Sequence, residues 1–322
     1  MLTTRRHHVS NGDGYDLAIA QAYDPARLVP GRPPVLLVPG YGMSSFIFGF
    51  HPRGVSFERS LAEAGFEVWR CDLRAQGDSV NRGGSDVYGL ADLARADLGA
   101  VIAGVLDRTV TGRDRVDVIG CSLGGTLALL YAALAENPRI DKRVMMGTPV
   151  RWVKVHPMVR AAFFSPRLVS AVPLRGTRAL AEALLPQAAR FAPGLLRVYL
   201  NPDIVDLTAA REMARTVEDP NRHVNGEIAR WIRARDLIAG GVNLSDAIRS
   251  MAGPLLVVIA NGDGIVPRET AEFVIEASAL ARPRRLDVGT ASLQMAHADM
   301  FVSNHAEERV FGPIARWLAD PL

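Results

Sequence analysis

Cysteine is scarce in this 322-residue sequence, in which Cys71 and Cys121 are the only two. Each lies at the end of an apolar run that is typical of a buried strand. A disulfide framework of the kind that staples small secreted domains is therefore not expected. The cysteine content favours a reducing compartment.

Long apolar runs are missing as well. Arg5 and Arg6 lie near the start of the sequence, but residues 10–14 form a polar run where a secretory signal would need an apolar stretch. No later run approaches the roughly 20 apolar residues of a membrane-spanning helix. We therefore expect a cytoplasmic protein without an integral membrane segment.

Basic charge is present without a basic cluster. Lys142 and Lys154 are the only lysines, the arginines are scattered, and the formal net charge is +3. Nucleic-acid binding needs a concentrated basic patch, so we do not expect it. Hydrophobic residues make up 48% of the chain and charged residues 22%, which predicts a globular protein with a substantial core.

Short β-rich runs alternate with helical stripes at both ends of the sequence. The stripes lie at residues 90–105, 123–134 and 310–318. This alternation is typical of an α/β fold with a mostly parallel central sheet flanked by helices. The predicted strands are residues 35–38, 66–69, 116–119, 144–146, 255–259 and 285–288.

Between residues 151 and 250 the alternation stops. We find no convincing strand there, and seven prolines divide the segment into short helical pieces. We therefore predict a core domain of residues 1–150 and 251–322, with residues 151–250 as an inserted helical cap. We expect most large apolar residues of the cap to form a small core of its own, and some to roof an apolar pocket. These residues are Phe163, Phe164, Leu168, Leu184, Leu185, Phe191, Leu195, Leu196, Tyr199 and Trp231.

A candidate nucleophile lies at the turn between the predicted strand 116–119 and the helical stripe that starts at Leu123. Residues 120–124 read Gly-Cys-Ser-Leu-Gly, the pattern of a sharp turn that presents a serine openly. A serine hydroxyl is a weak nucleophile at neutral pH and must be presented to a base. The strand before the turn and the helix after it favour Ser122 as a nucleophile over a plain structural turn.

Two backbone N–H groups are candidates for binding a developing oxyanion. The N–H of Leu123 lies at a helix N-terminus beside Ser122. We expect the second from the glycine-containing loop after residues 35–38, where Tyr41 is the first choice and Gly42 or Met43 a near alternative. The alternatives for this loop are a flexible turn and a dinucleotide-binding loop, but the third glycine of the latter is missing.

A base and an orienting acid can be sought downstream of the serine. Of the seven histidines, His7 and His8 lie in the N-terminal tail, and only His297 lies between the last predicted strand and the last helix. Asp263 follows the strand 255–259 in a glycine-flanked loop, where an aspartate is usually only a turn residue. The order Ser, Asp, His, each after a different strand, favours His297 as general base and Asp263 as the acid that orients it.

No motif for a cofactor or a metal ion rises above chance. The sequence lacks a phosphate-binding loop, a hydride-transfer fingerprint and a zinc motif. We expect Asp299, near His297, to be a local hydrogen-bonding residue. We therefore predict neither a bound cofactor nor a metal. Nothing in the sequence sets the number of subunits.

From Val35 to Trp317 these features resemble the α/β-hydrolase superfamily. Residues 72–79, Asp-Leu-Arg-Ala-Gln-Gly-Asp-Ser, are similar to its Asp-x-Arg-Gly-x-Gly-x-Ser turn, with Ala75 where glycine is usual. We expect this turn to be structural, with Arg74 as a stabilising partner. Pro39 and Gly40 stand where the superfamily commonly has His-Gly.

The second half also resembles the polyhydroxyalkanoate synthase branch of this superfamily. The similarity lies in residues 231–233 and 241–244 and in the loops around Asp263 and His297. Those synthases use a cysteine at the elbow. Here Ser122 occupies that position, and the preceding Cys121 is expected to point into the core.

These patterns predict a serine hydrolase. We expect cleavage of a small-molecule carboxylic ester or thioester with an apolar acyl group, through an acyl-enzyme on Ser122. One alternative is an acyltransferase that resolves the same acyl-enzyme with an alcohol, as the synthase resemblance suggests. The other is a non-catalytic binding protein on the same fold.

Overall fold

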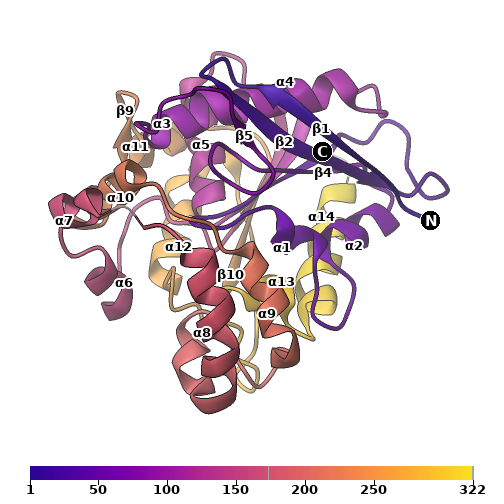
Figure 1. Cartoon of the computed structure of the whole chain (residues 1–322). Coiled ribbons are helices and arrows are strands. Elements are labelled where there is room, and N and C mark those ends of the chain that lie inside the picture. Colours follow the sequence, from indigo (N-terminus) through magenta and orange to yellow (C-terminus); the bar gives the residue numbers. More distant parts are fainter. Residues whose placement is uncertain (173, 321–322) are drawn as a thin grey trace.

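The computed structural model describes residues 1–172 and 174–320, and a mostly parallel sheet of nine strands forms its centre (Figure 1). The strand order is β1-β2-β4-β3-β6-β7-β10-β11, and β5 pairs with β2. The strands are β1 (Thr3–Ser10), β2 (Tyr15–Tyr23), β3 (Val35–Val38), β4 (Val68–Cys71), β5 (Val80–Asn81), β6 (Val116–Cys121), β7 (Ile140–Met146), β10 (Leu255–Ala260) and β11 (Arg284–Val288).

All neighbouring strands from β4 to β11 run parallel, which confirms the predicted fold class. Each of the six predicted strands is present. The prediction for β4 began two residues early, because Phe66 and Glu67 precede the strand. The carboxyl ends of parallel strands meet at one edge of the sheet, so the loops after β3, β6, β10 and β11 are brought together there.

The antiparallel hairpin of β1 and β2 was missed by the sequence analysis. The polar run at residues 10–14 is its turn, in which the Asn11 side chain accepts hydrogen bonds from the N–H groups of Asp13 and Tyr15. His7 and His8 therefore lie in a strand and not in a tail. Most residues of β1 are exposed, so the strand lacks the apolar pattern that marked the others.

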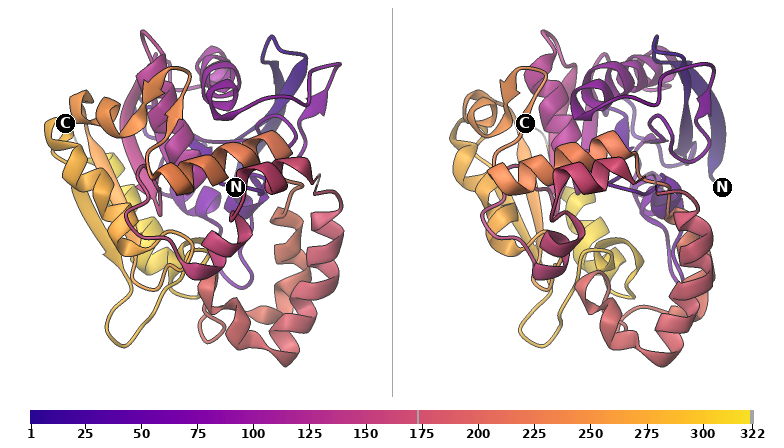
Figure 2. Two further views of the ribbon diagram at one scale, coloured as in Figure 1. Left: turned by 90° about the vertical axis from the view of Figure 1, so that its left-hand side faces the viewer. Right: turned by 60° about the vertical axis from the view of Figure 1, so that its left-hand side comes forward.

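Helices cover both faces of the sheet (Figure 2). Apolar residues of α4, α5, α11 and α12 pack with one face in one core cluster, and those of α2, α13 and α14 pack with the other face in a second. The helices outside the segment 151–250 are α1 (Phe46–Gly49), α2 (Phe57–Glu63), α3 (Leu90–Asp92), α4 (Gly99–Arg108), α5 (Leu123–Leu134), α12 (Arg268–Ala277), α13 (Asp299–Val302) and α14 (Gly312–Ala319), with π-helical turns at Leu93–Leu98 and Glu307–Phe311 and a 3₁₀ turn at Ala279–Ala281.

The segment between β7 and β10 adds no strand to the main sheet among its described residues, although it forms a hairpin of two very short strands that we had not predicted. No described helix is long and apolar enough to cross a membrane. The elements of the segment are α6 (Pro157–Ala162), α7 (Pro166–Ala171), α8 (Thr177–Phe191), η2 (Pro193–Val198), η3 (Leu207–Ala209), α9 (Ala210–Met213), η4 (Ala214–Thr216), α10 (Arg222–Ala234), β8 (Ile238–Ala239), β9 (Val242–Asn243) and α11 (Leu244–Ser250).

The two ends of this segment pack differently. Trp231 of α10 and Ile248 of α11 are buried in the main core cluster. By contrast, α6, α7, α8 and η2 contain no buried residue. The prediction of a separate small core is therefore wrong: Phe164 and Phe191 are 64% and 71% exposed. Short helices in a single layer cannot enclose a core. The division into a core and a cap domain stays a prediction.

The turn at residues 72–79 is held by buried charge. The guanidinium of Arg74 donates to the carboxylate of Asp97, with a shortest distance of 2.6 Å, and it also binds Asp13. Arg74 and Asp97 are 4% and 0% exposed. This confirms Arg74 as a stabilising partner of the turn. Ala75 has a φ of 58°, a left-handed conformation that explains why glycine is usual at this position.

We expect Arg74→Ala to lower the free energy of unfolding by about 3–5 kcal/mol, because it removes the cation paired with the buried Asp97 carboxylate. Among the described residues, only the Asn11 side-chain amide and the backbone N–H at position 74 would then donate to that carboxylate. Urea denaturation measures the change. The matched control is Arg82→Ala, which breaks the exposed pair with Asp16 and should change stability by less than about 1 kcal/mol. Equal, small losses in both variants would contradict this account.

Candidate active site

Ser122 lies at the turn between β6 and α5 with a φ of 51° and a ψ of −120°. A non-glycine residue rarely adopts this strained conformation, which clusters at functional sites. The turn is held by the Ser122 N–H, which donates to the carbonyl of Met146 at 2.8 Å. The backbone therefore keeps the Ser122 side chain at the carboxyl edge of the sheet.

The glycines on either side of Ser122 are required by close packing. A Cβ on Gly120 would lie 2.3 Å from the Cα of Gly125. A Cβ on Gly124 would lie 2.3 Å from the carbonyl oxygen of Val38. These distances are too short for any side chain, so the Gly-x-Ser-x-Gly pattern reflects a strand, a helix and a loop that meet at one point.

His297 and Asp263 form a buried pair at the same edge. The Nδ1 of His297 lies 2.6 Å from Oδ2 of Asp263, and the side chains are 6% and 2% exposed. The other carboxylate oxygen, Oδ1, accepts hydrogen bonds from the backbone N–H groups of Ile265 and Val266, at 2.8 Å each. These bonds fix the carboxylate, which in turn fixes the tilt of the imidazole ring.

Gly147 connects this pair with Ser122. It follows Met146, whose carbonyl binds the Ser122 N–H, and a Cβ on Gly147 would lie 3.0 Å from both Asp263 Oδ2 and His297 Cε1. The structure thus brings the three predicted residues to one place. The hydrogen bonds among the described residues include Asp263 with His297 but none between the Ser122 hydroxyl and the His297 ring.

Two opposing effects set the pKa of His297. Burial lowers it, but the charge and the hydrogen bond of Asp263 raise it above the usual value of 6.5. The Cys121 thiol also favours the charged ring. Cys121 lies in the core as expected, yet its side chain is also a neighbour of His297, which the sequence analysis did not foresee.

The two candidate oxyanion donors lie on either side of Ser122. Leu123 is the first residue of α5, so its N–H has no acceptor within the helix. Tyr41 follows Gly40, where a Cβ would lie 3.1 Å from that of Ser122. The Tyr41 side chain is anchored by its hydroxyl, which donates to Asn225 at 2.6 Å.

The sequence analysis missed a set of hydrogen bonds that holds the His297 loop in place. The buried Asp299 carboxylate accepts the N–H groups of Ala296 at 2.6 Å and of Asn201 at 3.0 Å. Burial raises the pKa of Asp299 to about 6, although these N–H groups hold it down. The local role expected for Asp299 is confirmed. Its partner Asn201 lies 98 positions earlier, and no sequence pattern pairs the two.

An apolar pocket of about 380 Å³ opens beside Ser122. Tyr41 and Leu123 also line it, so both candidate oxyanion donors and the candidate nucleophile lie at the same space. We expected some of the large apolar residues in the segment 151–250 to roof such a pocket. Five of them do line it: Phe163, Leu195, Leu196, Tyr199 and Trp231. The lining is almost entirely aliphatic or aromatic, which suits an acyl chain.

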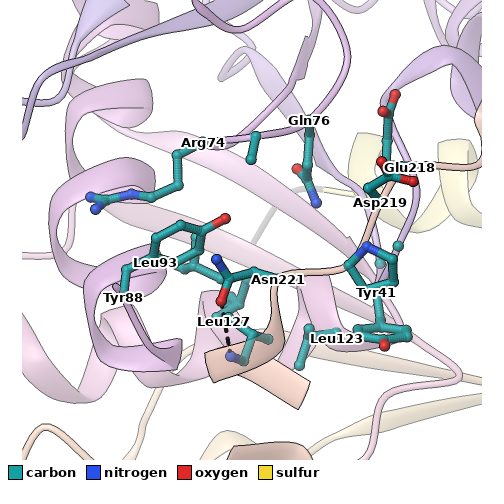
Figure 3. A pocket seen from close by; sticks show the side chains of 15 residues that line it. Tyr41, Arg74, Gln76, Tyr88, Leu93, Leu123, Leu127, Glu218, Asp219 and Asn221 are labelled. Atoms are coloured by element: carbon teal, nitrogen blue, oxygen red, sulfur yellow. Dashed lines mark hydrogen bonds between the residues drawn. The ribbon is translucent and has the colours of Figure 1, made fainter. Parts of the chain in front are cut away.

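A second, small cavity of about 40 Å³ shares Tyr41 and Leu123 with the apolar pocket and has a mixed polar and apolar lining (Figure 3). Gln76 and Asn221 line it, and the Arg74 guanidinium points away from it. This volume holds a few water molecules at most. The apolar pocket is therefore the larger space next to Ser122. Among the described residues, no three His, Cys, Asp or Glu side chains are placed to hold a metal ion.

Comparisons with known proteins agree with this architecture. The structure is similar to a hydrolase from Pseudomonas aeruginosa, with 18% identity over 98% of this chain and 99% of that one and a TM-score of 0.64. It is also similar to an esterase from Exiguobacterium antarcticum (16% identity, 98% and 100% covered, TM-score 0.65). A third similar structure is the enol-lactonase from Burkholderia xenovorans (17% identity, 97% and 100% covered, TM-score 0.62).

A search of curated proteins found no match to the sequence. The family described as "alpha/beta hydrolase fold" matches residues 33–288, a range that begins just before β3 and ends with β11. It therefore includes Ser122 and Asp263. With its parallel sheet and serine elbow, the chain belongs to the α/β-hydrolase fold family.

Proposed function

We propose that the protein hydrolyses a carboxylic ester or thioester with an apolar acyl group. The observation that carries the proposal is the apolar pocket, which has the strained Ser122 at its wall. The buried pair of His297 and Asp263 lies at the same edge of the sheet. A nucleophile, a base and an orienting acid are the parts that acyl transfer to serine requires.

The proposed reaction has two stages. The His297 Nε2 removes the proton of the Ser122 hydroxyl while Ser122 Oγ attacks the carbonyl carbon of the substrate. The π electrons of the carbonyl bond move to the carbonyl oxygen, which becomes an oxyanion. The N–H groups of Leu123 and Tyr41 donate to this oxyanion. Collapse expels the alcohol or thiol with the proton from His297 and leaves the acyl group on Ser122. Water then repeats the sequence and releases the free acid.

Asp263 acts through His297 in this scheme. Its hydrogen bond holds the proton on Nδ1, so Nε2 is the nitrogen left to act as base. The carboxylate also stabilises the positive ring that forms in each stage. The N–H groups of Ile265 and Val266 donate to the carboxylate and hold it in position against the ring.

The segment 151–250 acts as a cap in this proposal. Phe163, directly after α6, lies in an edge-on arrangement with Tyr41, with the ring centres 5.7 Å apart. Phe163, Leu195 and Leu196 all line the pocket. The cap thus supplies apolar surface to an acyl group held beside Ser122. Excluding water from this space strengthens the hydrogen bonds to the oxyanion.

Replacing Ser122 with alanine tests the nucleophile. We expect Ser122→Ala to lose labelling by a fluorophosphonate probe and to lower the turnover of short- and medium-chain aryl esters by about 10⁴-fold or more. The control Ser292→Ala changes an exposed serine and should keep both activities. Turnover that survives in Ser122→Ala would reject the mechanism.

The same assay separates two other functions. An acyltransferase would make little free acid when an acceptor alcohol is present. A binding protein would show neither labelling nor turnover.

The pH profile tests the pair of His297 and Asp263. His297 must be neutral to accept a proton, so kcat/KM should rise with pH through the pKa of His297. Because Asp263 raises that pKa, the midpoint should lie above 6.5. Asp263→Asn removes the two largest raising effects and leaves the lowering effect of burial, so proton NMR should find a lower pKa for His297.

We also expect Asp263→Asn to lower kcat by about 10⁴-fold. The control Asp287→Asn removes an exposed carboxylate and should shift neither the profile nor the rate. An unchanged His297 pKa in Asp263→Asn would show that the pair does not control the base.

A further inference from the structure

Helix α8 is apolar on two sides, but only one side is covered. Leu185 and Ala189 pack against the core cluster that contains α14. On the other side Leu180, Leu184 and Phe191 are 58%, 55% and 71% exposed. A soluble helix normally presents polar residues to water on its outer face. Helix α8 lies at the periphery of the molecule in both views of Figure 2.

Exposed apolar side chains also line the apolar pocket, and one of them lies on η2, which contacts α8. Met158, Leu195 and Tyr199 line the pocket and are also 58%, 73% and 40% exposed. We call these three residues, together with Leu180, Leu184 and Phe191, the rim surface. Exposed apolar groups gathered around a pocket mark an interaction site more often than isolated ones do.

Charge along the same segment is strongly asymmetric. Residues 157–199 contain six arginines and one acidic residue, Glu182, so this segment alone carries a formal charge of +5 while the whole chain carries +3. The remainder of the chain is therefore slightly negative. The arginines are Arg160, Arg167, Arg175, Arg178, Arg190 and Arg197.

Several of these arginines are available to a partner. Arg160, Arg167 and Arg190 form no ion pair with any residue that the structure describes. The Arg190 guanidinium lies 5.0 Å from the ring centre of Phe191, so a positive group is held beside the exposed aromatic residue of α8. The segment that carries the exposed apolar side chains thus also carries arginines that are free to bind a negative partner.

We propose that the rim surface docks onto an anionic lipid bilayer. Exposed apolar side chains can enter the boundary between headgroups and acyl chains, while arginines bind lipid phosphates. A second copy of the chain fits less well, because a symmetric contact would place arginines of one copy against those of the other. The charge of the segment calls for a negative partner.

Docking would place the mouth of the apolar pocket against the lipid surface. An apolar ester dissolved in the bilayer could then enter the pocket without crossing water. This use of docking rests on the proposed function, whereas binding to lipid does not require it. The experiment therefore measures binding in the Ser122→Ala variant, which keeps the surface intact.

Co-sedimentation with vesicles tests the proposal. We expect the protein to bind vesicles of phosphatidylcholine mixed with phosphatidylglycerol, to bind pure phosphatidylcholine weakly, and to be released by high salt. The double variant Leu184→Ser and Phe191→Ser should bind roughly tenfold more weakly. Arg167→Gln combined with Arg190→Gln should bind roughly tenfold more weakly as well.

The matched control is Ile238→Ser, which removes a side chain that is 71% exposed outside the rim surface and should not change binding. Circular dichroism and turnover of a water-soluble short-chain ester by variants that retain Ser122 should be unchanged in all cases. Binding that ignores lipid charge, or equal losses in the control, would overturn the proposal. So would a dimer in sedimentation that dissociates when Leu184 and Phe191 are changed.

Discussion

The hydrogen bond between Asp263 and His297 is the interaction on which the proposed chemistry depends. It joins loops that follow two different strands, and both side chains are buried. A charged pair removed from water is stable only when its remaining lone pairs are satisfied. Here two backbone N–H groups donate hydrogen bonds to the second carboxylate oxygen. Gly147, which follows β7, has no side chain that would push against the pair. The sheet therefore fixes the position of the imidazole before any substrate arrives.

Much of the fold and the site could be predicted because the relevant signals are local. A buried parallel strand is an apolar run, and Ser122 follows such a run and precedes a leucine-striped helix. Asp263 and His297 also follow strands, so their position at one edge comes from the rule that parallel strands end together. The structure shows their hydrogen bond, whereas their catalytic roles remain proposals.

The features that were missed depend on contacts between distant residues. Strand β1 is exposed on most of its length and has no apolar pattern of its own. Asn201 meets Asp299 only after the segment 151–250 has folded back over the sheet edge. The apolar residues of α8 were expected inside a small core, because hydrophobic composition does not reveal whether a second layer is present to cover them.

The attachment of η2 limits how the pocket could open. The Val198 carbonyl accepts the N–H of Gly264, and the Tyr199 carbonyl accepts that of Ala298. Each hydrogen bond links the C-terminal end of η2 to a residue adjacent to Asp263 or His297. Residues 198–201 must therefore move as one body with the two loops, and any hinge that admits a bulky ligand has to lie upstream, among the short helices. Widening the entrance from that side leaves the imidazole undisturbed.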